Sequence, residues 1–220
     1  MAQSDYPTAR QFLPEERNLN SLARASRGCQ GCPLFRNAKQ TVFGVGAADA
    51  QIMLVGEQPG RREDEAGEPF VGPAGKVLDR ALEEAGMRRG DLYITNCVKH
   101  FKSESQNGGR RGKKPNISEI NACRPWLESE IEAVQPEIII ALGAVAARSL
   151  AGRPLTVGEA IGNWLETQEG RDLIVTYHPS ATLRAPAESD RDRIFDVLAS
   201  DLSRAWEAVG PMRPGPRAGV

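Results

Sequence analysis

Histidine, cysteine and long apolar runs are scarce in this sequence, and neither sign of charge dominates it. Its 28 basic and 29 acidic residues leave a net charge of −1. This balance excludes a general polyanion binder, so any affinity for nucleic acid must come from a local patch. The longest apolar run, residues 138–147, is too short to cross a bilayer, and the first residues lack the apolar stretch of a signal peptide. We therefore expect a cytoplasmic protein with no membrane contact.

The few cysteines suggest a metal site rather than disulfides. A cytosolic chain seldom holds structural disulfides, and Cys29 and Cys32 form a CxxC pair. Zinc normally requires a second close pair, which is lacking, and a redox dithiol normally follows a strand, which is not predicted before Cys29. An iron–sulfur cluster accepts dispersed ligands, here drawn from Cys97, His100 and Cys123. The residues rank an iron–sulfur cluster above zinc, and zinc above a dithiol.

Apolar runs and helical periodicity alternate along the chain. Apolar runs that end in turns predict strands within residues 51–60, 91–100 and 172–180. Helical spacing predicts helices at residues 75–87, 117–134 and 188–209, with Ser118 as an N-cap. Residues 136–152 predict a short buried strand, a Gly turn and a helix. This alternation predicts an α/β fold with a mostly parallel sheet between two helical layers. Residues 21–209 form the expected domain, between a loosely ordered segment, 1–20, and a flexible tail, 210–220.

Four predicted strands end in residues with possible chemistry: GEQPG (56–60), TNCVKH (95–100), ALGA (141–144) and YHPS (177–180). In α/β folds, ligands bind at the carboxyl ends of the strands. The alternative is that Gly, Pro and Asn simply form turns there. The four together favour an active site.

Five residues near these strand ends are candidates for the site. A carboxylate at Glu57 can orient water or face a developing cation. The amide of Asn96 offers a donor and an acceptor, as the edge of a nucleobase requires, although a turn-forming asparagine is the simpler interpretation. His178 is one of only two histidines. Phe70 can stack on a flat ligand, but the residues alone favour a core position. The acidic residues at 63–68 are expected to be solvated or to cap a helix, although Asp64 can belong to the site.

Other residues suggest contacts with a nucleic-acid backbone. Ser180 and Arg184 can bind phosphate, and Leu183 can act as an apolar wedge in a duplex. The segment SESQNGGRRGKKPN, residues 103–116, carries four cations and no apolar side chain. No GK[ST] follows GEQPG, so that loop is not a nucleotide-binding Walker loop.

Taken in order, the motifs CxxC, GEQPG, EDxxGxPFVGPAG, YxTNxVK, ACRPWL, LG and HPS resemble the iron–sulfur uracil-DNA glycosylases of the family-four type. The resemblance covers roughly residues 20–205, and the UdgX branch, which shares GEQPG and VKHFK, is the most similar. It implies a three-layer α/β/α fold with a four-stranded parallel sheet. It also implies hydrolysis of the N-glycosidic bond of deoxyuridine in single- or double-stranded DNA, by a monomer in the bacterial cytosol and nucleoid.

The resemblance also implies roles for the pocket residues. Gln58 and Asp64 would line the pocket, Phe70 would stack on the flipped uracil, and Asn96 would bond to its Watson–Crick edge. Glu57 would act on the water or stabilise the sugar cation.

His178 would support negative charge on uracil O2. Bond cleavage creates a cationic sugar and an anionic base, so a carboxylate near the first and a donor near the second are favourable.

The family's cluster, a [4Fe-4S] group, implies four ligands. Cys29, Cys32 and Cys123 occupy three of those positions, and His100 occupies the fourth, as in UdgX. Cys97 lies three residues earlier and would point to the opposite side of an extended strand. We therefore expect His100 to be the ligand, and the cluster to be structural.

The basic segment departs from UdgX, in which a histidine of the corresponding loop attacks the sugar and crosslinks protein to DNA. Residues 103–116 contain no histidine. We therefore expect a turnover enzyme without a stable adduct. Arg110, Arg111, Lys113 and Lys114 are expected to contact phosphates from a flexible loop. The alternatives are a non-catalytic iron–sulfur DNA-binding module and a crosslinking protein that uses another nucleophile, such as a loop lysine.

Overall fold

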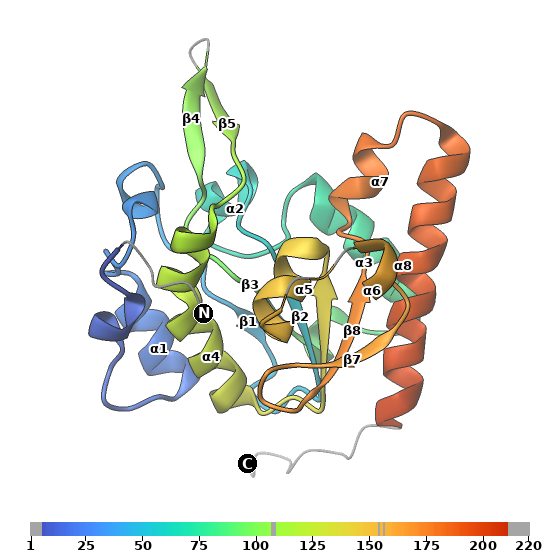
Figure 1. Cartoon of the computed structure of the whole chain (residues 1–220), viewed down its shortest axis with the longest axis horizontal. Helices are drawn as coiled ribbons and strands as arrows, with labels where there is room; N and C mark the ends of the chain where they lie inside the picture. The colour runs from blue at the N-terminus through green and yellow to red at the C-terminus, as the bar shows by residue number, and fades with distance from the viewer. Residues whose placement is uncertain (1–5, 107–108, 154, 156, 211–220) are drawn as a thin grey trace, which may run out of the picture.

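A central sheet in strand order β1-β3-β2-β6-β8-β7 organises the computed structural model (Figure 1). The structure describes residues 6–106, 109–153, 155 and 157–210. The four inner strands run parallel, and an antiparallel strand flanks them on each side. The strands are β1 Val45–Gly46, β2 Ile52–Gly56, β3 Tyr93–Asn96, β6 Ile138–Leu142, β7 Trp164–Glu166 and β8 Asp172–Thr176.

The prediction of a four-stranded parallel sheet is thus correct for the centre of the sheet, but the total number of strands is wrong. The sheet has six strands because β1 and β7, of two and three residues, pair with its edges. Neither edge strand contains the buried apolar run that identifies a strand in the sequence. Their end residues are exposed, as is common at a sheet edge.

Helices cover both faces of the sheet. The helical segments are η1 Ala9–Phe12, α1 Leu19–Ser26, η2 Pro33–Arg36, α2 Arg61–Ala66, α3 Pro73–Glu84, η3 Arg89–Asp91, α4 Ile117–Val134, α5 Ala144–Ala151, α6 Val157–Ala160, α7 Ser180–Arg184 and α8 Glu188–Val209. Helices α1, α4 and α5 lie on one side, and α3 and α8 on the other. Within the described ranges, no helix is both long and apolar enough to pass through a membrane.

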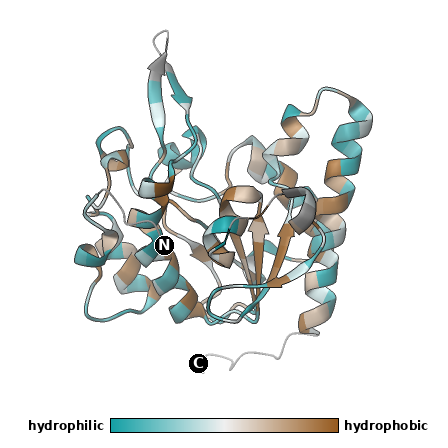
Figure 2. Ribbon diagram, in the orientation of Figure 1, coloured by the Kyte–Doolittle hydropathy of each residue, from teal (hydrophilic) through white to brown (hydrophobic). Residues whose placement is uncertain are grey.

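Each inner strand contributes side chains to two hydrophobic cores, because successive side chains point to opposite faces of the sheet. In β2, Met53 and Val55 pack toward α4 and α5, whereas Ile52 and Leu54 pack toward α3 and α8. Strands β2 and β6 are therefore buried along their whole length, and the apolar residues of the inner strands form the brown centre of Figure 2. A parallel sheet buried on both faces has this pattern.

The N-cap of helix α4 lies two positions before the predicted one. Asn116, not Ser118, is the N-cap, and its side chain accepts from the backbone N–H of Glu119. The Glu119 carboxylate accepts from the N–H of Asn116 in return, which completes a capping box. This cap fixes the point where the basic segment ends and α4 starts.

The N-terminal segment contacts the body of the protein. The sequence predicts loose order over residues 1–20, but η1 packs against α4 and its Ala9 is fully buried. Residues 1–5 and most of the predicted tail, 211–220, lie outside the described part of the chain.

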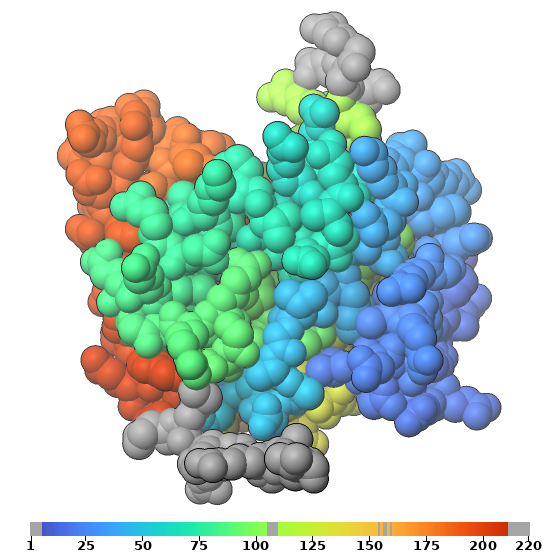
Figure 3. All heavy atoms as spheres, turned by 180° about the vertical axis from the view of Figure 1, so that it is seen from behind, coloured from blue at the N-terminus to red at the C-terminus, as the bar shows by residue number. Residues whose placement is uncertain are grey.

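The basic segment forms a β-hairpin rather than the expected flexible loop. Strand β4, Ser103–Gln106, pairs antiparallel with β5, Gly109–Gly112. The hairpin projects above α2 in Figure 1 and, seen from behind, in Figure 3. Helix α7 lies at the same end of the molecule, so the hairpin and α7 stand beside the ends of the parallel strands.

Candidate active site

The candidate catalytic residues lie at the carboxyl ends of three of the four parallel strands, β2, β3 and β8. Glu57 follows β2, Asn96 ends β3, and His178 lies two residues beyond β8. Gly56 and Asn96 are register partners, so the ends of β2 and β3 coincide. The sheet therefore presents a carboxylate, an amide and an imidazole at the carboxyl ends of its parallel strands.

Phe70, in the loop between α2 and α3, also lies at this end of the sheet. Its backbone has a positive φ of 55°, which is uncommon for a side chain of this size, and it is 5% exposed. Its ring centroid lies 5.8 Å from that of His178. A Cβ built on Gly56 would lie 2.6 Å from the Phe70 ring and 2.4 Å from the side-chain oxygen of Asn96. The absence of a side chain at Gly56 therefore lets these two groups meet.

The amide of Asn96 is nearly inaccessible, at 1% exposure. Its buried oxygen has no hydrogen-bond partner among the described residues. Buried acceptors are normally satisfied, so an unpartnered one calls for an explanation. A ligand that donates a hydrogen bond beside Phe70 would supply the missing partner.

The imidazole of His178 is held in one tautomer. Its Nδ1 accepts from the backbone N–H of Ser180 at 3.1 Å and lies 2.7 Å from the Ser180 hydroxyl. Arg184 in turn donates to that hydroxyl at 2.7 Å. Burial, with a smaller contribution from the charge of Arg184, lowers the pKa of His178 to about 4. The ring is therefore neutral near pH 7, and its proton lies on Nε2.

The carboxyl group of Glu57 is partly buried at the end of β2. Burial raises its pKa above the ordinary value, and the positive charges of Lys114 and Arg184 partly oppose that rise. One of these cations comes from the end of the hairpin and the other from α7. Glu57 therefore lies between the two elements expected to contact DNA.

Gln58 connects the site to the base of the hairpin. Its side-chain nitrogen donates to the Lys113 carbonyl at 2.6 Å, and its oxygen accepts from the Lys102 N–H at 3.0 Å. The resemblance assigns Gln58 to the pocket. In this structure the nitrogen and the oxygen of its side-chain amide both bond to the base of the hairpin.

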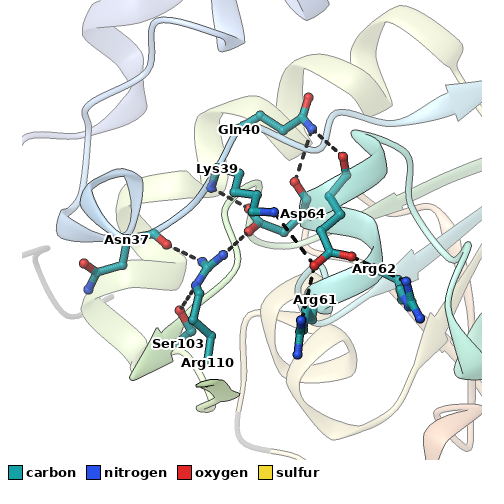
Figure 4. A network of polar contacts seen from close by, with 9 residues as sticks. Asn37, Lys39, Gln40, Arg61, Arg62, Asp64, Ser103 and Arg110 are labelled. Carbon is teal, nitrogen blue, oxygen red and sulfur yellow. Dashed lines mark hydrogen bonds and ion pairs between the residues drawn. The ribbon is translucent and has the colours of Figure 1, made fainter. Parts of the chain in front are cut away.

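Asp64 and Arg110 form the second connection (Figure 4). The Asp64 side chain is fully buried and accepts from Arg110 Nη1 at 2.6 Å and from the Lys39 N–H at 2.9 Å. Arg110 also donates to the Ser103 hydroxyl and to the Asn37 carbonyl. In this structure the guanidinium of Arg110, which the sequence predicts to contact phosphate, ties the hairpin to α2.

The remaining predicted DNA contacts lie at the surface. Lys114 is exposed, and Lys113 forms a surface ion pair with Glu104 at 2.5 Å. Arg111 is exposed on β5, opposite Glu104. On α7, Leu183 is 52% exposed.

Three of the four cysteines lie close together, with Cys29 and Cys32 just before η2 and Cys123 on α4. Cys29 Sγ accepts from the indole N–H of Trp126 at 3.2 Å, and Cys123 Sγ accepts from the Lys99 N–H at 3.3 Å. Burial raises the pKa of Cys32 to about 11, and a charge on Cys29 contributes to the rise. Burial raises the pKa of Cys123 as well, with contributions from Cys32 and Cys29. The three thiols are thus close enough to interact electrostatically.

The fourth cysteine lies apart from this group. Burial raises the pKa of Cys97 to about 11, and its side chain bonds to Ser149, with no cysteine among the groups that act on it. Burial lowers the pKa of His100 to about 4, so a neutral imidazole is available there. No three His, Cys, Asp or Glu side chains within the described ranges already stand in a metal-binding arrangement.

Sequence reasoning missed three buried charges. Glu63, expected to be solvated or to cap a helix, is 7% exposed and accepts from the Gly72 N–H at 2.8 Å, which closes the loop that carries Phe70. Lys99 and Glu130 form an ion pair in which both side chains are fully buried. A glutamate three positions after the N-cap of α2 is a recognisable signal for Glu63. The Lys99–Glu130 pair has no such signal, because its members lie 31 positions apart.

The comparisons with known proteins agree with this fold. Residues 43–203 match the family described as the uracil DNA glycosylase superfamily. The chain belongs to this superfamily. It is 39% identical over 180 residues to a type-4 uracil-DNA glycosylase of Pyrobaculum aerophilum, covering 77% of this chain and 87% of that one. It is 36% identical over 191 residues to a type-4 uracil-DNA glycosylase of Thermotoga maritima, covering 86% and 94%. A type-4 uracil-DNA glycosylase of Saccharolobus solfataricus is 37% identical over 200 residues, with 87% of each chain covered.

Proposed function

We propose that this protein hydrolyses the N-glycosidic bond of deoxyuridine in DNA and releases uracil and an abasic site. The observation that carries the proposal is the buried, unpartnered amide oxygen of Asn96 beside Phe70 and His178. A pocket with an aromatic face, an amide and a neutral imidazole matches the face, the edge and the O2 atom of one uracil.

Recognition of uracil rests on the edge that Asn96 presents. The Asn96 oxygen accepts from uracil N3–H, and its amide nitrogen donates to O4. Cytosine offers the opposite groups at these positions and leaves the buried amide unsatisfied, which costs about 1–3 kcal/mol. Phe70 stacks on the base, and the closed loop held by Glu63 keeps the ring in place.

His178 acts on the departing base. As the C1′–N1 bond breaks, its electron pair passes to uracil, and negative charge collects on O2. The Nε2–H of a neutral His178 donates to that oxygen, and the charge-free ring requires no proton transfer. Ser180 and Arg184 keep the ring in this tautomer.

Glu57 acts on the sugar. Its carboxylate orients a water molecule toward C1′ and stabilises the positive charge that develops there. The water oxygen bonds to C1′, and the proton that it loses balances the charge of the departing uracil anion.

The base must leave the stack before these groups reach it, at a cost of a few kcal/mol. We propose that Leu183 fills the vacated space in the duplex, while Arg184 and Ser180 contact the adjoining backbone. The hairpin cations Arg111, Lys113 and Lys114 bind phosphates on the other side of the site.

Cys29, Cys32, Cys123 and His100 are the residues that would hold a [4Fe-4S] cluster. The donor set fits this group: three thiols interact, two sulfur atoms already accept N–H bonds, and the imidazole is neutral. Such a cluster would join residues 29–32, the segment after β3 and α4. Hydrolysis requires no electron, so the cluster would have a structural role.

We also propose that the enzyme acts as a monomer. We further propose that it forms no stable bond to DNA, because residues 103–116 lack the histidine of UdgX. The test is alkaline cleavage of oligonucleotides that contain uracil, hypoxanthine or thymine, in single and double strands. Glu57→Gln and His178→Ala should each lose most of the cleavage at uracil. Binding without cleavage by the wild-type protein would favour a non-catalytic module, and a protein–DNA band that survives SDS would refute turnover.

A further inference from the structure

The ion pair between Lys99 and Glu130 lies beneath the base-recognition residue. Both side chains are fully buried, and the Lys99 ammonium donates to a Glu130 carboxylate oxygen. The same ammonium donates to the Thr95 hydroxyl at 2.6 Å and to the backbone carbonyl of Asn96 at 2.8 Å. The lysine therefore folds back onto the last two residues of β3.

Glu130 is held as firmly as the lysine. Its carboxylate accepts from the Gly44 N–H at 2.9 Å, from the Tyr93 hydroxyl at 3.1 Å and from the Thr95 hydroxyl at 3.0 Å. Every polar atom of the pair thus has a partner in the surrounding structure. This complete set of bonds fixes the ammonium in one position.

Stability alone does not account for such a pair. Removing two charges from water costs several kcal/mol per ion, and apolar residues of similar volume are often equally or more stable. The centre of the Phe43 ring lies 5.5 Å from the ammonium, but a cation–π attraction is smaller than the cost of burying the two ions. A role in fixing local geometry explains the charge better.

The geometry that the pair fixes is that of Asn96. Beyond Asn96 the chain leaves β3 and stays beside β2 through bonds from the Cys97 N–H to the Gly56 carbonyl and from the Val98 N–H to the Glu57 carbonyl. The carbonyl of Asn96 points to the ammonium, so the ammonium sets the orientation of this peptide and hence of the side chain that it carries.

We propose that Lys99 is a positioning residue for uracil recognition, which aims the Asn96 amide at the base while Glu130 holds Lys99 in place. The inference rests on the proposed function. Helix α4 holds the segment at two points seven residues apart on one face, since Cys123 Sγ accepts from the Lys99 N–H and Glu130 binds its ammonium. Only the second bond uses the lysine side chain.

The test compares Lys99→Met with the double variant Lys99→Met/Glu130→Leu, which removes both charges. Lys102→Met is the matched control, because Lys102 forms an ion pair with Glu119 of the same helix at 2.8 Å but does not contact Asn96. The measurements are the melting temperature, the iron content, the single-turnover rate of uracil release, and the affinity for uncleavable oligonucleotides that carry 2′-fluoro-deoxyuridine or 2′-fluoro-deoxycytidine.

We expect the double variant to stay folded with a lower melting temperature, because the Tyr93 and Thr95 hydroxyls lose a buried acceptor, and to keep its iron, since the bond from the Lys99 N–H to Cys123 remains. Its single-turnover rate should fall at least about tenfold, and its preference for the uridine analogue should fall by about the same factor. The control, Lys102→Met, should keep the wild-type single-turnover rate and the wild-type preference for the uridine analogue. A double variant with the wild-type rate and preference would overturn the proposal, as would an activity loss that follows iron loss.

The binding measurement separates this inference from the proposed function. A wild-type protein that released no uracil would contradict the proposed function. A wild-type preference for the uridine analogue that the double variant lost would still support the role of Lys99, whereas an unchanged preference would overturn it.

Discussion

Arg110 of the hairpin donates to the fully buried carboxylate of Asp64 in α2 across 2.6 Å. This pair changes the interpretation of the basic segment. One of its four cations is an internal anchor, and Gln58 supplies a second anchor at the hairpin base. The remaining cations are thereby presented to DNA from a folded arm instead of a loop that orders on binding.

The anchor predicts different results for two cations of the same segment. Arg110→Met leaves the Asp64 charge buried without its ion-pair partner, so we expect a loss of about 3 kcal/mol in the free energy of unfolding. Lys114→Met, at an exposed position, should leave stability unchanged and reduce the slope of log Kd against log salt by about one. Urea denaturation and DNA titrations at several salt concentrations measure both. Equal stability of the two variants would contradict an anchoring role for Arg110.

The pH dependence of uracil release should reflect the neutral state of His178. Because its pKa is lowered from 6.5 to about 4, the ring gains no proton as the pH falls through 6.5. Glu57 must be ionised, and its pKa is raised from 4.5, so activity is lost as the pH falls through a value above 4.5. Single-turnover rates across this range should therefore show one acid limb.

The variant Glu57→Gln tests whether the Glu57 carboxyl causes this loss of activity at low pH. Its residual rate should stay flat through pH 6.5, since the titrating carboxyl is gone and His178 remains neutral. An inflection near pH 6.5 in this variant would show that His178 titrates normally and would contradict the buried, neutral ring.

The sequence predicted the parallel centre of the fold because each inner strand lies in an apolar run that ends at a turn. It could not predict β1 or β7, which are short and held by pairing with a neighbour rather than by an apolar pattern. The hairpin was misjudged for a different reason. Its charges suggested a solvated loop, whereas the dipeptide Asn107-Gly108 in the sequence is itself a hairpin signal.

The positions of the residues at the strand ends could be predicted from the sequence, but only some of the groups that they contact could. Glu57, Asn96 and His178 follow from the rule that ligands bind at the carboxyl ends of parallel strands. The bond between Asp64 and Arg110 joins positions 46 residues apart, and no local pattern encodes it. Contacts of this kind depend on how finished elements pack, which periodicity and spacing do not describe.

Gly56 should be intolerant of even one added carbon. A Cβ there would lie 2.4 Å from the Asn96 oxygen and 2.6 Å from the Phe70 ring, so Gly56→Ala must displace one of them. A misplacement of about 1 Å in a site can reduce the rate about 100-fold, and we expect a loss of that order in single-turnover uracil release. Gly90→Ala is the matched control, because a Cβ at Gly90 meets no atom within 4 Å. Equal rates for the two variants would contradict the close packing at Gly56.

Cysteine substitution should separate cluster ligands from a buried bystander. Cys123→Ala should lose the iron, the visible absorbance and part of the thermal stability, because Cys123 interacts with Cys29 and Cys32 and lies on α4. Cys97→Ala removes an equally buried thiol that bonds to Ser149, so we expect it to keep the full iron content and absorbance. His100→Ala should behave like Cys123→Ala if the imidazole completes the ligand set. Iron loss in Cys97→Ala with iron retained in His100→Ala would instead assign the fourth position to Cys97.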